Sequence, residues 1–418
     1  MKKAHILLLA VLLVFFGTAC SPAKVVSSNY KDAYVENEDF NPTANPLSGF
    51  RFSTVTTDEG IFFNAGAYLF YMDYTTRKAV PLCSKPECMH QEETDARKIL
   101  NCDAYIGAAR QYGHFIAMFK DKLYVTILDP SSGDYNLVEM NSDGSECSEI
   151  MKGFFSRGIN YICMHRGVIY FDSEMYSADG DPIIRINAIS LVSGRQKPAV
   201  IYEATEKGVI LNGFMPYKNK LYMVFFTENH DERSQEFSLS IWIEAYDILT
   251  GETVRLPVED MNICGAFEDK LTLVGQKGFY EYDTLSQSGE FVESGLALFY
   301  REHEDWQCMV DLMDEDLSMV AALKTDTKEH EAVEGLMVVD SKGNLLGVIQ
   351  DNAWGRSTGA IIRIHGEEYY MRYMGSSAPF SICLFKKEDL LNGNMEPETI
   401  LYADDLNDLQ PGYIISNE

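Results

Sequence analysis

Three cysteines and one histidine lie within one short stretch of this chain, spaced C-x4-C-x-H-x11-C. They are Cys83, Cys88, His90 and Cys102. Because thiolate and imidazole ligands satisfy tetrahedral zinc, the set could form a Cys3His zinc site. The spacing is not that of a standard zinc finger, and in an exported protein such a site must escape oxidation.

The same cysteines could instead form a disulfide. A bond from Cys102 to Cys83 or Cys88 would close a loop of about 15–20 residues and contribute about 3 kcal/mol to stability. Three cysteines are an odd number, so one disulfide does not account for the whole set. Three unbonded thiols are the remaining interpretation. The sequence favours the disulfide over zinc, and zinc over free thiols, because disulfides commonly cross-link loops that lack a hydrophobic core in exported proteins.

Export itself is predicted from the first twenty residues. Two lysines precede an apolar run of 11 residues, Ile6–Phe16, which is too short to span a bilayer core of about 30 Å. Small residues then lead to Cys20, which is the pattern of an export signal. The segment resembles a bacterial lipoprotein signal, in which this cysteine is lipidated, although Gly17 stands where a leucine is usual. An ordinary secretory signal cleaved nearby is the alternative.

The prediction is therefore a signal peptide at residues 1–19, a polar tether at 20–48 with its lipid on Cys20, and a folded domain at 49–418. This organisation places the protein at the cell membrane, on its extracytoplasmic face. No later run approaches 18 apolar residues, so no transmembrane helix is expected.

The chain is strongly acidic, with a formal net charge of −28. Loss of residues 1–19 removes two lysines and no acid, which brings the charge to −30. Such a surface repels phosphate backbones, so nucleic-acid binding is disfavoured. It would also be repelled by an anionic membrane surface, so a covalent lipid rather than electrostatic attraction must hold the protein there.

One pattern recurs seven times from residue 49 onward. A short apolar strand ends in a tight turn, an aromatic and aliphatic strand follows, a third strand ends in a D-x-x-T/S-G turn, and a fourth completes the unit. The turns before the second strands begin at residues 58, 120, 165, 218, 268, 314 and 365, which are 45 to 62 residues apart. Four strands repeated at about 50 residues are typical of a β-propeller.

We predict an all-β fold, a propeller of seven four-stranded blades, with the Cys/His insert at 83–102 between the first two blades. Because the first and last repeats are degenerate, a propeller of six or eight blades remains possible. Ring closure is expected to mix strands from both ends of the chain in one blade, with 50–55 or 412–415 as the closing strand.

The other cysteines have a simpler interpretation. Cys163, Cys264 and Cys308 lie just before turns, which predicts the innermost strands, where small side chains fit and a buried thiol acts as a small hydrophobe. Cys383 lies in a strand of the last repeat and is interpreted in the same way. Cys147 lies beside an exposed turn and has no obvious partner.

The run PLCSKPECMH…NCDAY (Pro81–Tyr105) follows the strand pair YMDYTTRKAVPL. Together with the lipoprotein signal, it resembles a group of TolB-like β-propeller lipoproteins of Gram-positive bacteria that carry a similar Cys/His cassette. This resemblance implies a propeller and an envelope location, and it implies no activity.

No G-x-S-x-G, H-E-x-x-H or Gly-rich phosphate motif marks an enzyme. The leading hypothesis is a monomeric, membrane-anchored binding or scaffold module for a peptide, a glycan or an envelope protein, with loops 225–237 and 369–380 as the contact surface. An envelope hydrolase or lyase using carboxylates at 228–232, 302–305 or 314–316 is one alternative. A metal-binding sensor is another. No cofactor is expected apart from zinc at the cassette, and 177–181 is a weak calcium candidate.

Overall fold

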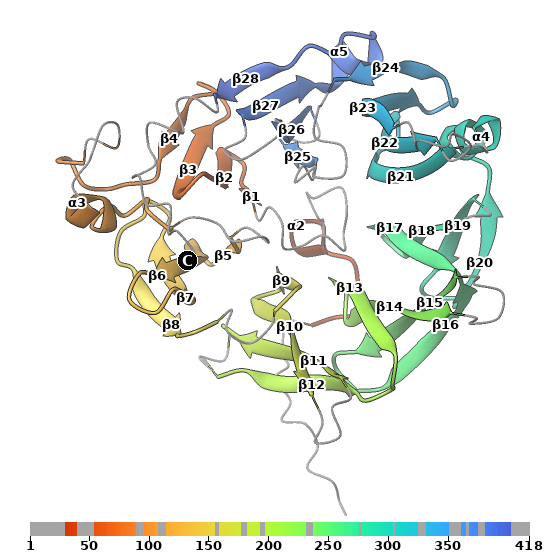
Figure 1. Ribbon diagram of the computed structural model, residues 1–418, viewed down its shortest axis with the longest axis horizontal. Coiled ribbons are helices and arrows are strands. Elements are labelled where there is room, and N and C mark those ends of the chain that lie inside the picture. Colours follow the sequence, from red (N-terminus) through yellow and green to blue (C-terminus); the bar gives the residue numbers. More distant parts are fainter. Residues whose placement is uncertain are drawn as a thin grey trace, which may run out of the picture.

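The computed structural model describes residues 30–39, 54–88, 90, 96–107, 114–154, 159–176, 182–192, 197–230, 237–275, 278–303, 306–324, 332–350, 361–364, 368–374 and 381–402. These residues form seven four-stranded antiparallel sheets arranged as blades in a ring, as Figure 1 shows. The predicted seven-bladed propeller is confirmed.

The strands of the first four blades are β1 (Val55–Thr56), β2 (Gly60–Ala65), β3 (Tyr68–Asp73), β4 (Ala79–Pro81), β5 (Ile116–Phe119), β6 (Lys122–Asp129), β7 (Asp134–Asn141), β8 (Ser148–Met151), β9 (Ile162–His165), β10 (Val168–Tyr176), β11 (Pro182–Ser190), β12 (Ala199–Ala204), β13 (Val209–Tyr217), β14 (Lys220–His230), β15 (Phe237–Asp247) and β16 (Thr253–Glu259). Those of the last three are β17 (Met261–Phe267), β18 (Lys270–Gly275), β19 (Gly278–Asp283), β20 (Ser288–Val292), β21 (Trp306–Met313), β22 (Leu317–Lys324), β23 (Ala332–Asp340), β24 (Leu345–Ile349), β25 (Ile362–Ile364), β26 (Tyr369–Met374), β27 (Ser381–Lys386) and β28 (Glu398–Leu401).

In the second to fifth blades, the turns that join first and second strands contain left-handed backbone. Such tight hairpin turns need positive φ in their central residues. Positive φ occurs at these turns, at Lys120, Asp121, Arg166, Lys218 and Glu268. Strands alternate in direction within each blade, so all the turns between first and second strands lie on one face of the ring.

The second strands are buried on both sides because each blade is packed between two neighbours. Every residue of β2 is buried. This explains the aromatic and β-branched composition of these strands. The predicted innermost positions of Cys163, Cys264 and Cys308 are confirmed, since β9, β17 and β21 are each the first strand of a blade.

Closure of the ring differs from the expectation. Each described blade consists of four consecutive strands, so the prediction that one blade mixes the two chain ends is wrong for these strands. Val55 belongs to β1, which pairs with β2 in the first blade. Residues 50–53 and 412–415 lie outside the described residues.

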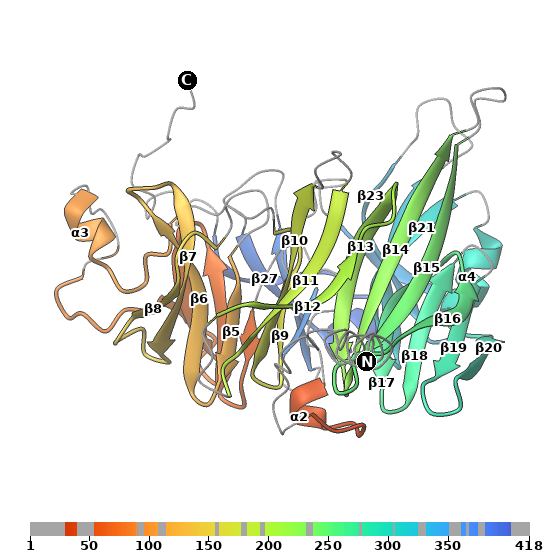
Figure 2. The same ribbon diagram turned by 90° about the horizontal axis from the view of Figure 1, so that it is seen from below.

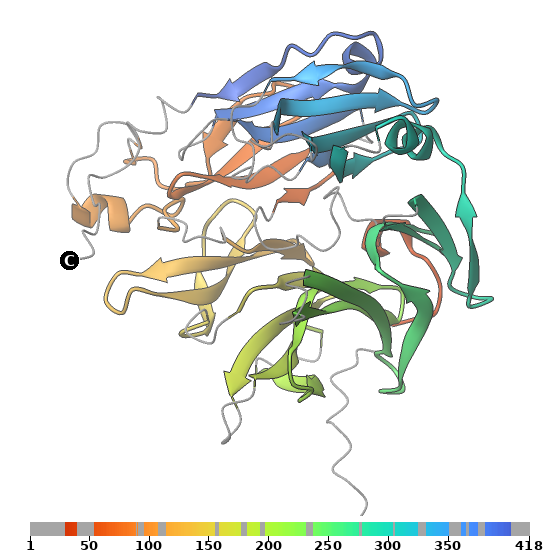
Figure 3. The same ribbon diagram turned by 45° about the vertical axis from the view of Figure 1, so that its right-hand side comes forward.

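Packing replaces strand exchange at the closing interface. The first and last blades lie side by side (Figure 3). Their buried side chains, among them Phe63 and Met371, form one hydrophobic cluster. The Tyr373 hydroxyl on β26 donates a 2.9 Å hydrogen bond across this interface to the Asn64 carbonyl on β2.

In the part of the chain that the structure describes, four short helices accompany the ring: α2 (Glu36–Asp39), α3 (Ala96–Leu100), α4 (Gly295–Glu302) and α5 (Lys387–Leu391). Helix α3 lies at the outer edge, and α2 lies on the central axis (Figure 1) on one face of the ring (Figure 2). Residues 30–39, within the segment expected to be a tether, therefore pack against the propeller. None of the helices in the described part of the chain is long and apolar enough to cross a membrane.

Replacement of Tyr373 by Phe tests the closing interface. The variant leaves a buried carbonyl without its donor, so the free energy of unfolding should fall by about 1–3 kcal/mol. Tyr402→Phe is the control, because Tyr402 is 60% exposed. Urea denaturation of both variants measures the difference, and equal midpoints would show that the hydrogen bond does not stabilise closure.

Candidate metal centre

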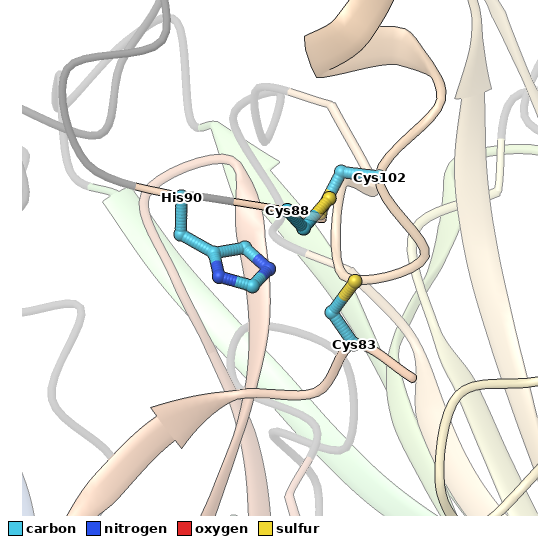
Figure 4. Close-up of side chains that lie close together, drawn as sticks. All are labelled: Cys83, Cys88, His90 and Cys102. Atoms are coloured by element: carbon cyan, nitrogen blue, oxygen red, sulfur yellow. The ribbon is translucent and has the colours of Figure 1, made fainter. Parts of the chain in front are cut away.

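The Cys/His insert connects the outer strand of the first blade to the inner strand of the second. Cys83 follows β4, and Cys102 follows α3. Figure 4 shows the side chains of Cys83, Cys88, His90 and Cys102 converging. One potential ligand atom from each residue lies within 4.8 Å of the others. The structure therefore brings together all four residues that the sequence singled out.

Both ends of the insert are fixed to the same part of the first blade. The Leu82 N–H donates to the Leu69 carbonyl at 2.8 Å. On the other arm, the Leu69 N–H donates to the Ala104 carbonyl at 2.8 Å, and the Ile106 N–H donates to the Ala67 carbonyl at 3.0 Å. Since residues 67–69 hold both arms, the positions of Cys83 and Cys102 are set by the blade itself.

Polar side chains join the two arms directly beside the cysteines. Lys85 forms a 2.8 Å ion pair with Asp103, and the Ser84 hydroxyl donates to the same carboxylate at 2.8 Å. The Lys85 ammonium also donates to the Asn101 carbonyl. Sequence reasoning missed Lys85 and Asp103, because their pairing has no spacing signal and depends on how the insert folds.

The three cysteines of the cluster are free thiols in this structure. Burial acts to raise the pKa of Cys83, but the N–H groups of Lys85 and Asp103 and the neighbouring thiols outweigh it and lower that pKa. Burial raises the pKa of Cys102, and burial together with Cys83 raises that of Cys88. Cys83 is therefore the most readily ionised thiol of the three.

His90 has two features that suit a ligand. Its φ of 41° lies in the left-handed region, which is uncommon for residues other than glycine and often marks functional positions. Its Nε2 atom is buried and has no hydrogen-bond partner among the described residues. Burial lowers the pKa of the imidazole, which favours the neutral form that binds metals.

The donor set fits zinc in number, type and distance. Zinc–ligand bonds of 2.0–2.3 Å in a tetrahedron separate donor atoms by about 3.5–3.8 Å, so the observed cluster needs only a small contraction. Zinc would use all three sulfurs and the histidine nitrogen. A disulfide between any two of the cysteines would leave the third thiol and the buried His90 Nε2 without a partner.

The other residues singled out from the sequence do not form a second candidate site among the described residues. The Asp314 side chain is buried, pairs with Lys387 at 2.8 Å and accepts from the Tyr370 hydroxyl at 2.6 Å, which is a structural arrangement. Cys147 is exposed, and Cys383 is buried. Several sequence candidates lie outside the described residues: Cys20, 177–181, 231–236, 304–305 and 375–380.

No protein-family profile and no curated protein sequence matches this chain. Several solved structures are similar to it in fold. The tricorn protease is 13% identical, with a TM-score of 0.48 over 86% of this chain and 35% of that chain. A puromycin-hydrolysing peptidase of Mycobacterium tuberculosis is 10% identical, with a TM-score of 0.46 over 90% and 56%. A putative TolB from Agrobacterium tumefaciens is 9% identical, with a TM-score of 0.33 over 70% and 82%. This chain thus spans about a third of the length of the tricorn protease and just over half of the length of the puromycin-hydrolysing peptidase.

A glycine outside the insert tests how the cluster is held. Gly144 has φ +84°, and a Cβ there would lie 2.6 Å from the Leu82 carbonyl oxygen, next to Cys83. Gly144→Ala should therefore shift Leu82, lower stability and expose Cys83 to alkylating reagents. Gly133→Ala is the matched control, because its φ is +71° and no atom lies within 4 Å of its Cβ.

The measurements are the rate of iodoacetamide reaction with Cys83, followed by peptide mass spectrometry, and the urea midpoint. Faster alkylation and a lower midpoint in Gly144→Ala than in Gly133→Ala are expected. Identical behaviour would mean that the Gly144 turn does not position the Cys83 arm.

Proposed function

We propose that this protein is a lipid-anchored, extracytoplasmic binding propeller whose Cys3His cluster holds a structural zinc ion. The observation that carries the zinc assignment is the convergence of four potential ligand atoms within 4.8 Å. It is supported by the buried Nε2 atom of His90, which has no hydrogen-bond partner among the described residues.

The coordination points to a structural rather than a catalytic ion. Structural zinc sites use four protein ligands in a closed tetrahedron, whereas catalytic sites keep one position open for water or substrate. Cys83, Cys88, His90 and Cys102 would fill all four positions. The ion would then hold the two ends of the insert together, and loss of zinc would loosen the connection between the first two blades.

The binding role follows from how propellers use their connections. A rigid ring of blades positions loops, and such loops commonly carry ligand contacts. The insert, with α3, projects at the rim of the ring (Figure 1), where a fixed loop could contact a peptide, a glycan or another envelope protein. In this proposal zinc has no chemical role towards the ligand and acts by keeping the insert in one conformation.

Metal analysis of the mature chain, purified without chelator, tests the zinc assignment. About one zinc ion per chain is expected by inductively coupled plasma mass spectrometry. Cys88→Ser and Cys102→Ser should each lose most of the metal, because a three-ligand remnant binds zinc more weakly. Cys147→Ser removes an exposed thiol outside the cluster and should keep full occupancy.

Thiol counting separates zinc from a disulfide in the same samples. Zinc predicts that the three cluster thiols become reactive after denaturation with chelator and without reductant. A zinc content near zero, combined with two cluster cysteines that react only after reduction, would contradict the proposal.

Membrane attachment has its own test. The wild-type protein should fractionate with membranes and take up a labelled fatty acid in cells. Cys20→Ala should lose the label, because the residue that would carry the lipid is gone. A label that persists in Cys20→Ala would exclude this residue as the anchor.

A further inference from the structure

The segment that precedes the first blade is docked on the ring rather than extended away from it. Residues 30–39, which include α2, lie across the central axis on one face (Figures 1 and 2). Their partners come from the ends of the inner strands of the third, fourth and fifth blades and the turns that follow, at residues 165–166, 217–218 and 267. One short segment thus touches three blades on the face where these turns lie.

A buried carboxylate is the centre of this contact. The Asp39 side chain is fully buried and accepts from Arg166 Nη2 at 2.6 Å. The Asp39 Oδ1 atom lies 2.6 Å from His165 Nε2 and accepts a hydrogen bond from the Lys218 N–H at 3.0 Å. Burial acts to raise the pKa of Asp39, but His165, the Val35 N–H and Arg166 outweigh it and lower the pKa to about 2. Asp39 is therefore ionised at any physiological pH.

Arg166 binds the segment at several points. Its guanidinium donates to the Lys31 carbonyl at 3.1 Å and to the Ala33 carbonyl at 2.8 Å, in addition to Asp39. The residue has φ 49°, so a left-handed turn directs this side chain at the segment. Removal of one partner of a buried ion pair is strongly unfavourable because the other charge stays buried without compensation.

Aromatic side chains dock the segment at two further points, its first residue and its middle. Tyr30 is 5% exposed, donates to the His165 carbonyl at 2.9 Å and accepts from the Tyr170 hydroxyl at 2.6 Å. The ring of Tyr34 lies 6.1 Å from that of Tyr217 and 5.5 Å from that of Phe267. A passive linker needs none of these buried contacts, so the segment has a defined place on the ring.

Chain length gives the docked segment a consequence for orientation. Tyr30 lies ten positions after Cys20, and an extended chain spans at most about 3.6 Å per position, or about 36 Å in total. An undocked tether of residues 20–48 would reach about 100 Å and leave the ring free to rotate. Docking therefore keeps this face of the ring close to the anchor.

We infer that residues 30–39 are a latch that turns this face of the propeller toward the membrane and leaves the opposite face to the ligand. The inference rests on the proposed anchor at Cys20. Among the described strands, β14 and β15 are the longest, and they project from the face opposite α2 (Figure 2), where a ligand approaching from outside would meet them first.

Two label positions can report the orientation. Leu285 lies in the turn after β19, on the latch face, since the neighbouring Thr284 N–H donates to the Asp269 carbonyl in the turn before β18. Ser132 lies in the turn between β6 and β7, on the opposite face. A fluorophore is placed at one or the other through a non-natural amino acid, and energy transfer to an acceptor lipid in phosphatidylglycerol–phosphatidylcholine vesicles is measured.

The protein is attached in two ways, as the lipidated chain and as the chain from residue 20 with an N-terminal polyhistidine on nickel-chelating lipids. Energy transfer from position 285 should exceed that from position 132 at least twofold with both kinds of attachment. Asp39→Asn should remove the difference, and Glu36→Gln, which changes an exposed carboxylate of the same helix, should retain it. Circular dichroism checks that both variants are folded.

Equal transfer from the two positions in the wild-type protein, or greater transfer from position 132, would overturn the latch whatever the variants do. Failure of the proposed anchor has a different signature. In that case the chain made in cells does not bind vesicles, while the polyhistidine arm still shows the orientation.

Discussion

The structure depends on one constraint: a four-stranded sheet in this chain cannot bury its own two faces. Every blade is therefore packed between two neighbours, and the second strands are buried from both sides, as all six residues of β2 show. The ring that results fixes the direction of each strand and places all the first turns on one face. Both candidate functional features, the cluster at the rim and the docked segment on the axis, are positioned by this arrangement.

The repeating pattern predicted the ring well because it records local chemistry. Turn residues with positive φ, such as Asp121 and Arg166, occur in the second to fifth units, and each of these turns precedes an apolar strand. The mode of closure was not predictable in the same way. It depends on packing between residues about 300 positions apart, such as Asn64 and Tyr373, and no periodicity records that contact.

The docked segment was missed for a related reason. Residues 30–39 are polar, their helix is only four residues long, and their partners lie at positions 165–166 and 217–218. Composition alone indicates a tether there. A buried Asp39–Arg166 pair becomes visible only when the ring has brought these distant residues together.

The Cys/His cluster was predictable from the sequence in part. The sequence identified all four side chains, but zinc and disulfide need the same cysteines, so spacing could not decide between them. Geometry adds two facts: four convergent potential ligand atoms, and a buried imidazole nitrogen without a hydrogen-bond partner among the described residues. Both favour a metal ion over a disulfide, since a disulfide would leave one thiol and His90 unused.

X-ray absorption at the zinc edge on the mature protein tests this account most directly. The account predicts a first shell of three sulfurs at about 2.3 Å and one nitrogen at about 2.0 Å. A shell of oxygen and nitrogen alone, or protein that contains no zinc, would contradict it.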